Sequence, residues 1–195
     1  FVSGSDIAAF EAKKKSNTKV IYLETPSNPL LTVKDLAKFS SFASKHNLIS
    51  IVDNTFATPI NQNPIAMGID IVVHSGTKYL GGHSDLCFGA IITSNTLASK
   101  IKNSSLNFGG SLNALDCYLV ERSLKTLDVR VQKHNANAQL ISEYLNSSAL
   151  VSKVFYPGLS SHPNHAIAKK QSKQGFGGML SFELVHVDTT ETFLN

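Results

Sequence analysis

The sequence has no tryptophan and only two cysteines, Cys87 and Cys117. They form no CxxC pair, which argues against a disulfide framework. This usage is typical of a reducing compartment, so we expect a cytoplasmic location, with both cysteines packed in the interior as small apolar residues. No apolar run approaches the ~18 residues that a membrane span needs, so we predict no membrane partner.

Charge is sparse as well, at 16% charged residues against 42% hydrophobic ones, which is a globular composition. The net charge is +4, but the lysines are scattered, with clusters only at 13–15 and 169–170. Without a basic stripe interleaved with aromatic residues, nucleic acid is not an expected partner.

Several ligand-binding motifs are also missing. There is no GxxxxGK[ST] sequence and no GxGxxG opening a helix, so neither nucleotide hydrolysis nor dinucleotide binding is supported. His74, His83 and Asp85 have a spacing that matches no common ligand pattern. The sequence therefore predicts no metal site.

What the sequence does contain is an alternation of short apolar runs and helical periodicity. Strands are predicted at residues 20–23, 49–52, 69–73 and 89–93, and those at 20–23 and 69–73 are expected to be buried. Helices are predicted at 6–15 and 33–46, with Leu36, Phe39 and Phe42 on one face of the second. This order predicts an α/β fold with a mostly parallel sheet.

The pattern changes after residue 111. From 113 to 145 apolar residues recur at helical spacing without proline or glycine, which predicts one long helix or two with a bend. Because such helices often bridge domains, we divide the chain into a large domain (1–124) and a second part (125–195). The second part would hold the bridging helix and the beginning of a smaller α/β domain, with strands at 154–156 and 179–185.

Chemically useful side chains follow two of the predicted strands. Asp53 comes directly after 49–52, and Lys78 comes after 69–73, preceded by Ser75 and Thr77. Open α/β sheets bind ligands at the carboxyl edge of their strands, so these residues are expected to meet there. The alternative for Lys78 is a solvated lysine in a surface turn. A carboxylate, Asp53, at the end of the neighbouring strand favours a binding site over this alternative.

These residue types suit one cofactor. A lysine stripped of part of its hydration has a lowered pKa and becomes a nucleophile for an aldehyde. A carboxylate facing a pyridine nitrogen keeps that nitrogen protonated, and the hydroxyls of Ser75 and Thr77 can accept a phosphate. Pyridoxal 5'-phosphate needs these three parts.

Three ordered motifs resemble the Cys/Met-metabolism, or transsulfuration, family of pyridoxal-phosphate enzymes. They are residues 24–29 (ETPSNP), 52–59 (VDNTFATP) and 73–85 (VHSGTKYLGGHSD). Residues 122–127, 156–163 and 175–179 match the same family, so the resemblance spans nearly the whole chain. The last two of these segments resemble cystathionine γ-synthase and γ-lyase most.

The resemblance implies the aspartate-aminotransferase-like fold, fold type I, with helices on both faces of the sheet. It makes Lys78 the lysine that forms a Schiff base with the cofactor and Asp53 the partner of the pyridine nitrogen. Ser75 and Thr77 become phosphate ligands, and Asn28 lies near the phenolic oxygen. The family usually has alanine or serine where this chain has Gly76, and we expect the glycine to loosen the turn.

The resemblance also implies γ-elimination or γ-replacement on cystathionine or an O-acylhomoserine, with Lys78 removing the substrate's α-proton. Partners are thus small sulfur-containing or O-acylated amino acids, and the intact enzyme is a homotetramer. Cystathionine β-lyase and methionine γ-lyase remain alternatives within the family.

The chain begins with Phe1 and stops at residues 191–195 inside a helix-like pattern, so we expect an internal piece of a longer protein. The family's ring-stacking tyrosine and its arginine for the substrate carboxylate cannot be located in it. A second reading is therefore a folded piece with no catalysis of its own.

Overall fold

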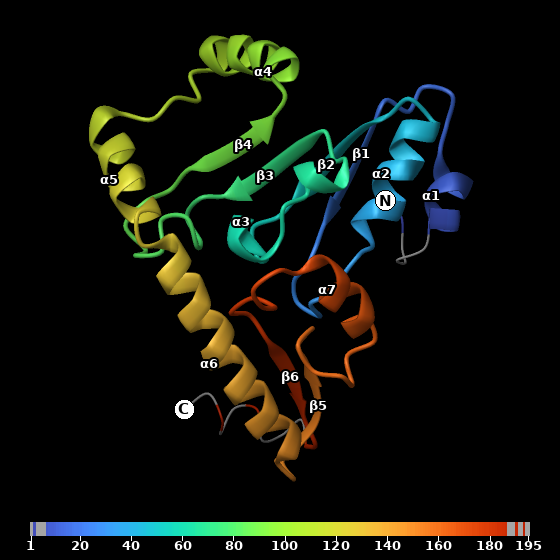
Figure 1. Ribbon diagram of the computed structural model, residues 1–195, viewed down its shortest axis with the longest axis vertical. Coiled ribbons are helices and arrows are strands. Elements are labelled where there is room, and N and C mark those ends of the chain that lie inside the picture. Colours follow the sequence, from blue (N-terminus) through green and yellow to red (C-terminus); the bar gives the residue numbers. More distant parts are fainter. Residues whose placement is uncertain (1, 3–6, 187–189, 191–192, 194–195) are drawn as a thin grey trace.

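The computed structural model describes residues 2, 7–186, 190 and 193. Its centre is a four-stranded sheet in the order β1-β2-β3-β4 (Figure 1). The strands are β1 (Val20–Glu24), β2 (Ile49–Asp53), β3 (Ile71–Ser75) and β4 (Gly89–Thr93). The first three are parallel, and β4 is antiparallel to β3, which confirms the predicted mostly parallel sheet. The third strand begins two residues later than predicted and ends at Ser75, closer to Lys78.

Two helices, α1 (Ile7–Lys13) and α2 (Leu36–Lys45), lie beside one face of the sheet (Figure 1). The predicted face of α2 is confirmed, because Leu36, Phe39 and Phe42 are buried in one cluster with residues of the strands. Each such burial stabilises the fold by roughly 1.5–3 kcal/mol. Residue 6, where the first helix was predicted to begin, lies outside the described residues.

The opposite face of the sheet is exposed to solvent at β1. In β1, Ile21 and Leu23 are buried against the helices, whereas Val20 is 45% and Tyr22 55% exposed. The strand predicted to be buried at residues 20–23 is therefore buried on one side only in β1. Alternation of exposure is what a strand shows when helices pack on only one of its faces.

Helices follow β4 along the chain. They are α4 (Asn95–Phe108), α5 (Ala114–Leu124) and α6 (Leu127–Ser147). The long helical stretch is thus two helices, separated at Lys125 and Thr126, as one of the two predictions had it. The helix α4 was not predicted, and none of its residues is buried. The short α3 (Thr58–Asn61) and η1 (Ile65–Met67) also form within or near predicted loops.

The last part of the chain packs against α6. It consists of β5 (Val151–Phe155), α7 (His165–Gln171) and β6 (Ser181–Leu184), with β5 and β6 antiparallel. Ala138 of α6 forms a core with Val154 and Tyr156, and the Tyr156 hydroxyl donates to the carbonyl of Gly177 at 3.0 Å. Residues 191, 192, 194 and 195, predicted to be helical, lie outside the described residues.

Buried amide side chains connect this last part to the sheet. Asn61 and Asn135 donate to each other's side-chain oxygens at 2.9 and 2.8 Å. Gln171 donates to Gln62 at 2.8 Å, and Gln62 donates to Asn54 at 2.7 Å. Within the described residues, no buried side-chain nitrogen or oxygen lacks a partner. The network fixes the loop that follows β2, because Asn54 is its first residue.

The two cysteines are free thiols, and both are exposed, so their predicted place in a packed interior is wrong. Cys87 precedes β4, and Cys117 lies on α5, where Ser123 is the one buried residue. Among the described residues, no helix has the length and apolar character needed to cross a membrane.

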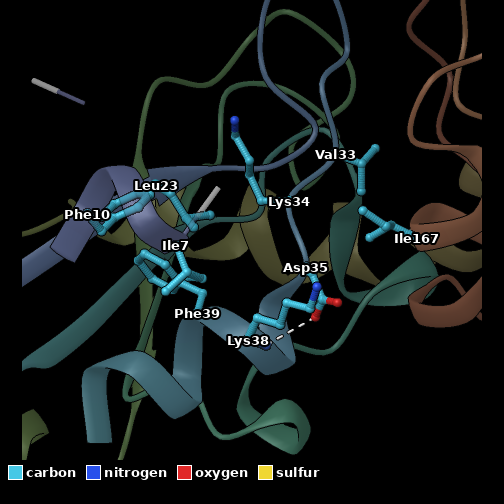
Figure 2. Close-up of a pocket in the computed structure, with 9 residues that line it drawn as sticks. All are labelled: Ile7, Phe10, Leu23, Val33, Lys34, Asp35, Lys38, Phe39 and Ile167. Atoms are coloured by element: carbon cyan, nitrogen blue, oxygen red, sulfur yellow. Dashed lines mark hydrogen bonds between the residues drawn. The ribbon is translucent and has the colours of Figure 1, made fainter. Parts of the chain in front are cut away.

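A small pocket lies between α1, α2 and β1 (Figure 2). Figure 2 shows Phe10, Leu23 and Phe39 on its wall and the Asp35 carboxylate accepting the Lys38 backbone N–H at the start of α2. None of the five predicted site residues lines this pocket, which belongs to the helix-covered side of the sheet.

Candidate cofactor site

All five predicted site residues lie at the carboxyl ends of three neighbouring parallel strands. Asn28 follows β1, Asp53 is the last residue of β2, and Ser75 is the last residue of β3. Thr77 and Lys78 occupy the turn directly after Ser75. The strand order β1-β2-β3 therefore brings all of them to one edge of the sheet, as the sequence predicted for the residues that follow β2 and β3.

Asp53 and Ser75 also project from the same face of the sheet. Asp53 pairs in register with Val73, and Ser75 is two residues further along β3. Because side chains alternate along a strand, residues paired in register and those two apart share a face. It is also the face on which Tyr22 of β1 is exposed.

The Asp53 carboxylate is half-buried and held in place. Its Oδ1 accepts the Thr55 backbone N–H at 2.9 Å, and its Oδ2 accepts the Tyr22 hydroxyl at 3.4 Å. Burial and the Asp53 charge raise the pKa of Tyr22, so the phenol stays protonated and donates. Sequence analysis missed Tyr22, although its register partner Ile51 lies two residues before Asp53 and thus on the same face.

The turn after β3 is stabilised by backbone hydrogen bonds. The Gly81 N–H donates to the Gly76 carbonyl at 2.7 Å, and the Gly82 N–H donates to the Lys78 carbonyl at 2.8 Å. The Ser75 N–H donates to the Thr55 hydroxyl at 2.8 Å, which ties this turn to the loop after β2.

The side chains of this turn are left available. In the described part of the chain, the Ser75 and Thr77 hydroxyls and the Lys78 ammonium have no hydrogen-bond or ion-pair partner. Lys78 is exposed, so the described part of the chain does not remove water from its ammonium group, contrary to the expectation from the sequence. An amine, a carboxylate and free hydroxyls at one edge are a donor set that fits pyridoxal phosphate, which carries an aldehyde, a basic ring nitrogen and a phosphate.

Gly76 has a different role from the predicted one. It is buried, its N–H donates to the Phe88 carbonyl at 2.7 Å, and a Cβ at this position would collide with the Phe88 ring. The glycine therefore admits a bulky side chain beneath the turn. It does not loosen the turn, because Phe88 fills the space.

The structure also places Asn28 and His74. Asn28 is exposed, and its backbone N–H donates to the Glu24 carboxylate at 3.3 Å. His74 is 5% exposed on the helix-covered face, and burial lowers its pKa. Within the described residues, no group of three or more His, Cys, Asp and Glu side chains could hold a metal ion.

An α/β sheet with a lysine, a carboxylate and free hydroxyls at its carboxyl edge has the parts of a pyridoxal-phosphate-binding protein. The sequence model of one family, Cys/Met metabolism PLP-dependent enzymes, matches residues 1–195. The chain belongs to this family.

Similar proteins support the assignment. Cystathionine beta-lyase of Lactococcus lactis subsp. cremoris (strain MG1363) is 52% identical over 97% of this chain and 50% of its own length. The solved structure of cystathionine gamma-lyase from Lactobacillus plantarum, complexed with L-serine, has a TM-score of 0.90 and 46% identity, covering 92% of this chain and 47% of that one. Cystathionine gamma synthase from Xanthomonas oryzae pv. oryzae, in complex with aminoacrylate and cysteine, gives a TM-score of 0.88 and 41% identity, covering 91% and 46%.

The two solved structures share this fold, and the three relatives bear the names of different reactions. The chain spans about half of their length. The predicted fold type and family are thereby confirmed, and the particular reaction is left open by the comparison.

Proposed function

We propose that the whole protein uses pyridoxal phosphate to eliminate or replace the γ-substituent of cystathionine or an O-acylhomoserine. The observation that carries the proposal is the meeting of Lys78, Asp53, Ser75 and Thr77 at one sheet edge, with the amine and hydroxyls unpartnered. The γ-lyase and γ-synthase names of two similar solved structures support the γ-carbon as the site of reaction.

The residues would divide the work as follows. Bound pyridoxal phosphate supplies an aldehyde that bonds to amines and a cationic ring that withdraws electrons. Asp53 would hold the proton on the ring nitrogen, since an opposite charge favours the charged form. Ser75 and Thr77 would donate to the phosphate, Asn28 would lie near the phenolic oxygen, and Lys78 would take the proton from the substrate's α-carbon.

A second candidate is β-elimination, as in cystathionine β-lyase, which the 52% identity to the Lactococcus protein favours. Both reactions need the same lysine and carboxylate. They differ in which bond of the substrate breaks. Residues other than Lys78, Asp53, Ser75 and Thr77 must select that bond.

Further parts of the proposal concern the whole protein. We place it in the cytoplasm, which the two free thiols support. We propose a homotetramer built from dimers, in line with the family resemblance. The 195-residue chain alone, with one sheet face open, is proposed to lack catalysis of its own.

The test is a set of assays on the full-length protein. Cysteine and α-ketobutyrate from cystathionine would identify a γ-lyase, homocysteine and pyruvate a β-lyase. Cystathionine formed from O-succinylhomoserine and cysteine would identify a γ-synthase, and methanethiol from methionine a methionine γ-lyase. Turnover by the isolated chain would contradict its proposed inactivity. A full-length protein that takes up no pyridoxal phosphate would contradict the proposal as a whole.

A further inference from the structure

The turn that carries Lys78 rests on α6, a helix about fifty residues further along the chain. Leu80 packs with Leu127 and Val131 in one buried cluster. The Tyr79 ring meets the His134 ring edge-on, with centroids 5.4 Å apart. Thus the two residues that directly follow Lys78 both contact α6.

One polar side chain of α6 also contacts this turn. The Arg130 Nη1 donates to the Tyr79 carbonyl at 2.8 Å, and its Nη2 donates to the Ser123 carbonyl at 3.0 Å. Its Nε donates to the Thr126 hydroxyl at 3.1 Å. All three acceptors are uncharged oxygens, and no ion pair involving Arg130 occurs in the described residues. The guanidinium therefore joins the end of α5, the start of α6 and the turn after β3.

Gly82 shows how closely the guanidinium and the turn approach. Its φ is +76°, and a Cβ at this position would collide with the Arg130 guanidinium. A side chain here would force one of the two to move. The second glycine of the Gly81-Gly82 pair is thus explained by Arg130 as well as by its backbone conformation.

We propose that Arg130 is a positioning residue for Lys78, because it fixes the carbonyl of the next residue, Tyr79, to the α5–α6 junction. The proposal rests on the proposed function, since it assumes that Lys78 bonds to the cofactor. Arg130 itself reaches only protein oxygens in the structure. Its effect on the cofactor would pass through the backbone of Tyr79.

The guanidinium geometry makes this role specific to arginine. A planar fork with five donors can bind three acceptors at once, whereas a lysine ammonium acts as a compact charge. Hydrogen bonds from charged groups are among the stronger ones, and losing the one that ties the turn to α6 should weaken cofactor binding by about tenfold to a hundredfold.

The test uses the full-length protein and the variants Arg130→Met, Arg130→Lys and Lys133→Met. Lys133 lies on α6, is exposed and has no partner among the described residues, so its replacement removes the same charge without touching the turn. The measurements are the dissociation constant of pyridoxal phosphate, the visible circular dichroism of the bound cofactor and the unfolding midpoint of the cofactor-free form. The dichroism reports how the ring is held, which a general loss of stability would not change.

We expect Arg130→Met to bind the cofactor about tenfold to a hundredfold more weakly and to change the dichroism, with Arg130→Lys restoring part of both and Lys133→Met matching the parent protein. An unchanged dichroism in Arg130→Met, or an affinity within twofold of the parent protein, would overturn the positioning role. Failure of the parent protein itself to bind pyridoxal phosphate would instead overturn the proposed function.

Discussion

Polar side chains gather in two places, at the carboxyl edge of β2 and β3 and in the interior between α3, α6 and α7, and they differ in how they are paired. In the interior, Asn54, Asn61, Gln62, Asn135 and Gln171 satisfy one another or backbone groups. At the edge, the hydroxyls and the lysine of the turn have no partner within the described residues.

The difference follows from solvent. A buried polar group without a partner costs about 1–3 kcal/mol, so the interior must pair its amides. An exposed group can remain bonded to water until a ligand replaces that water, so the edge can leave its groups unpaired. Pairing therefore marks structure here, and its absence on neighbouring side chains marks the place where a ligand is proposed to bind.

The largest effect should come from Lys78→Ala at the edge. Because Lys78 is exposed and unpartnered, we expect an unchanged unfolding midpoint in the cofactor-free protein but activity at least about a thousandfold lower. Steady-state assays and thermal melts of the full-length protein check this. Lys102→Ala, at an exposed lysine on α4, is the control, and a Lys78→Ala enzyme with more than a tenth of the parent activity would break the comparison.

Asp53→Asn should have the next largest effect. The amide keeps the shape of the side chain but removes the charge that would hold the ring nitrogen protonated. A charge that raises the pKa of the ring nitrogen by about two units raises its protonated fraction up to about a hundredfold, so we expect kcat to fall by a similar factor. The measurement is kcat of the full-length enzyme. Asp53→Glu, which retains the charge, should recover part of the activity; equal rates for the two variants would argue against the charge as the cause.

In the interior the expected loss is in stability. Gln171→Leu leaves the Leu36 N–H and the Gln62 side-chain oxygen without their partner, which we expect to lower the free energy of unfolding by about 2–4 kcal/mol. Urea unfolding measures the loss. The exposed neighbour Lys169→Ala should stay within about 0.5 kcal/mol. An unchanged cofactor affinity in Gln171→Leu would support a purely structural role for the interior network. A large loss of affinity without destabilisation would contradict that role.

Gly76→Ala tests the packing beneath the turn after β3, in which Gly76 lies between Ser75 and Thr77. The added methyl group meets the Phe88 ring, so we expect a cost of about 1–3 kcal/mol in unfolding free energy. The double variant Gly76→Ala/Phe88→Leu should recover part of it, since the smaller side chain makes room. If the single variant is as stable as the parent protein, the packing explanation for Gly76 is wrong.

The smallest effect concerns His74, which is buried while the next residue, Ser75, is exposed. Burial lowers the His74 pKa in the folded state, so the unfolded chain binds the proton more tightly and stability falls as pH drops through about 6.5. One such proton contributes at most about 1.4 kcal/mol per pH unit. Urea unfolding between pH 7.5 and 5 should show a shallower decline for His74→Gln; an identical pH slope would contradict the assignment.

Local sequence patterns predicted much of this fold. The apolar face of α2 follows directly from the spacing of Leu36, Phe39 and Phe42, and the strand ends follow from short β-branched runs. Because parallel strands align their carboxyl ends, these local patterns were enough to bring Asp53 and Lys78 to one edge. The helix α4 was missed because it is rich in serine and asparagine, which favour caps and turns over helix interiors.

Contacts between distant residues were beyond such patterns. Nothing near Gly76 indicates that Phe88 fills the space beneath it, and nothing near Tyr79 indicates an arginine on α6. The cysteines were misplaced for a similar reason. An apolar residue type gives no information about whether another segment covers it, and α5 leaves nearly all of its surface open.

The central claim is that the unpaired edge binds the cofactor through Lys78. Reducing the full-length protein with borohydride in the presence of pyridoxal phosphate and mapping the modified peptide by mass spectrometry tests it most directly. We predict one cofactor per chain, attached to Lys78 and absent from Lys78→Ala. Attachment at a different lysine, or none at all, would contradict the account.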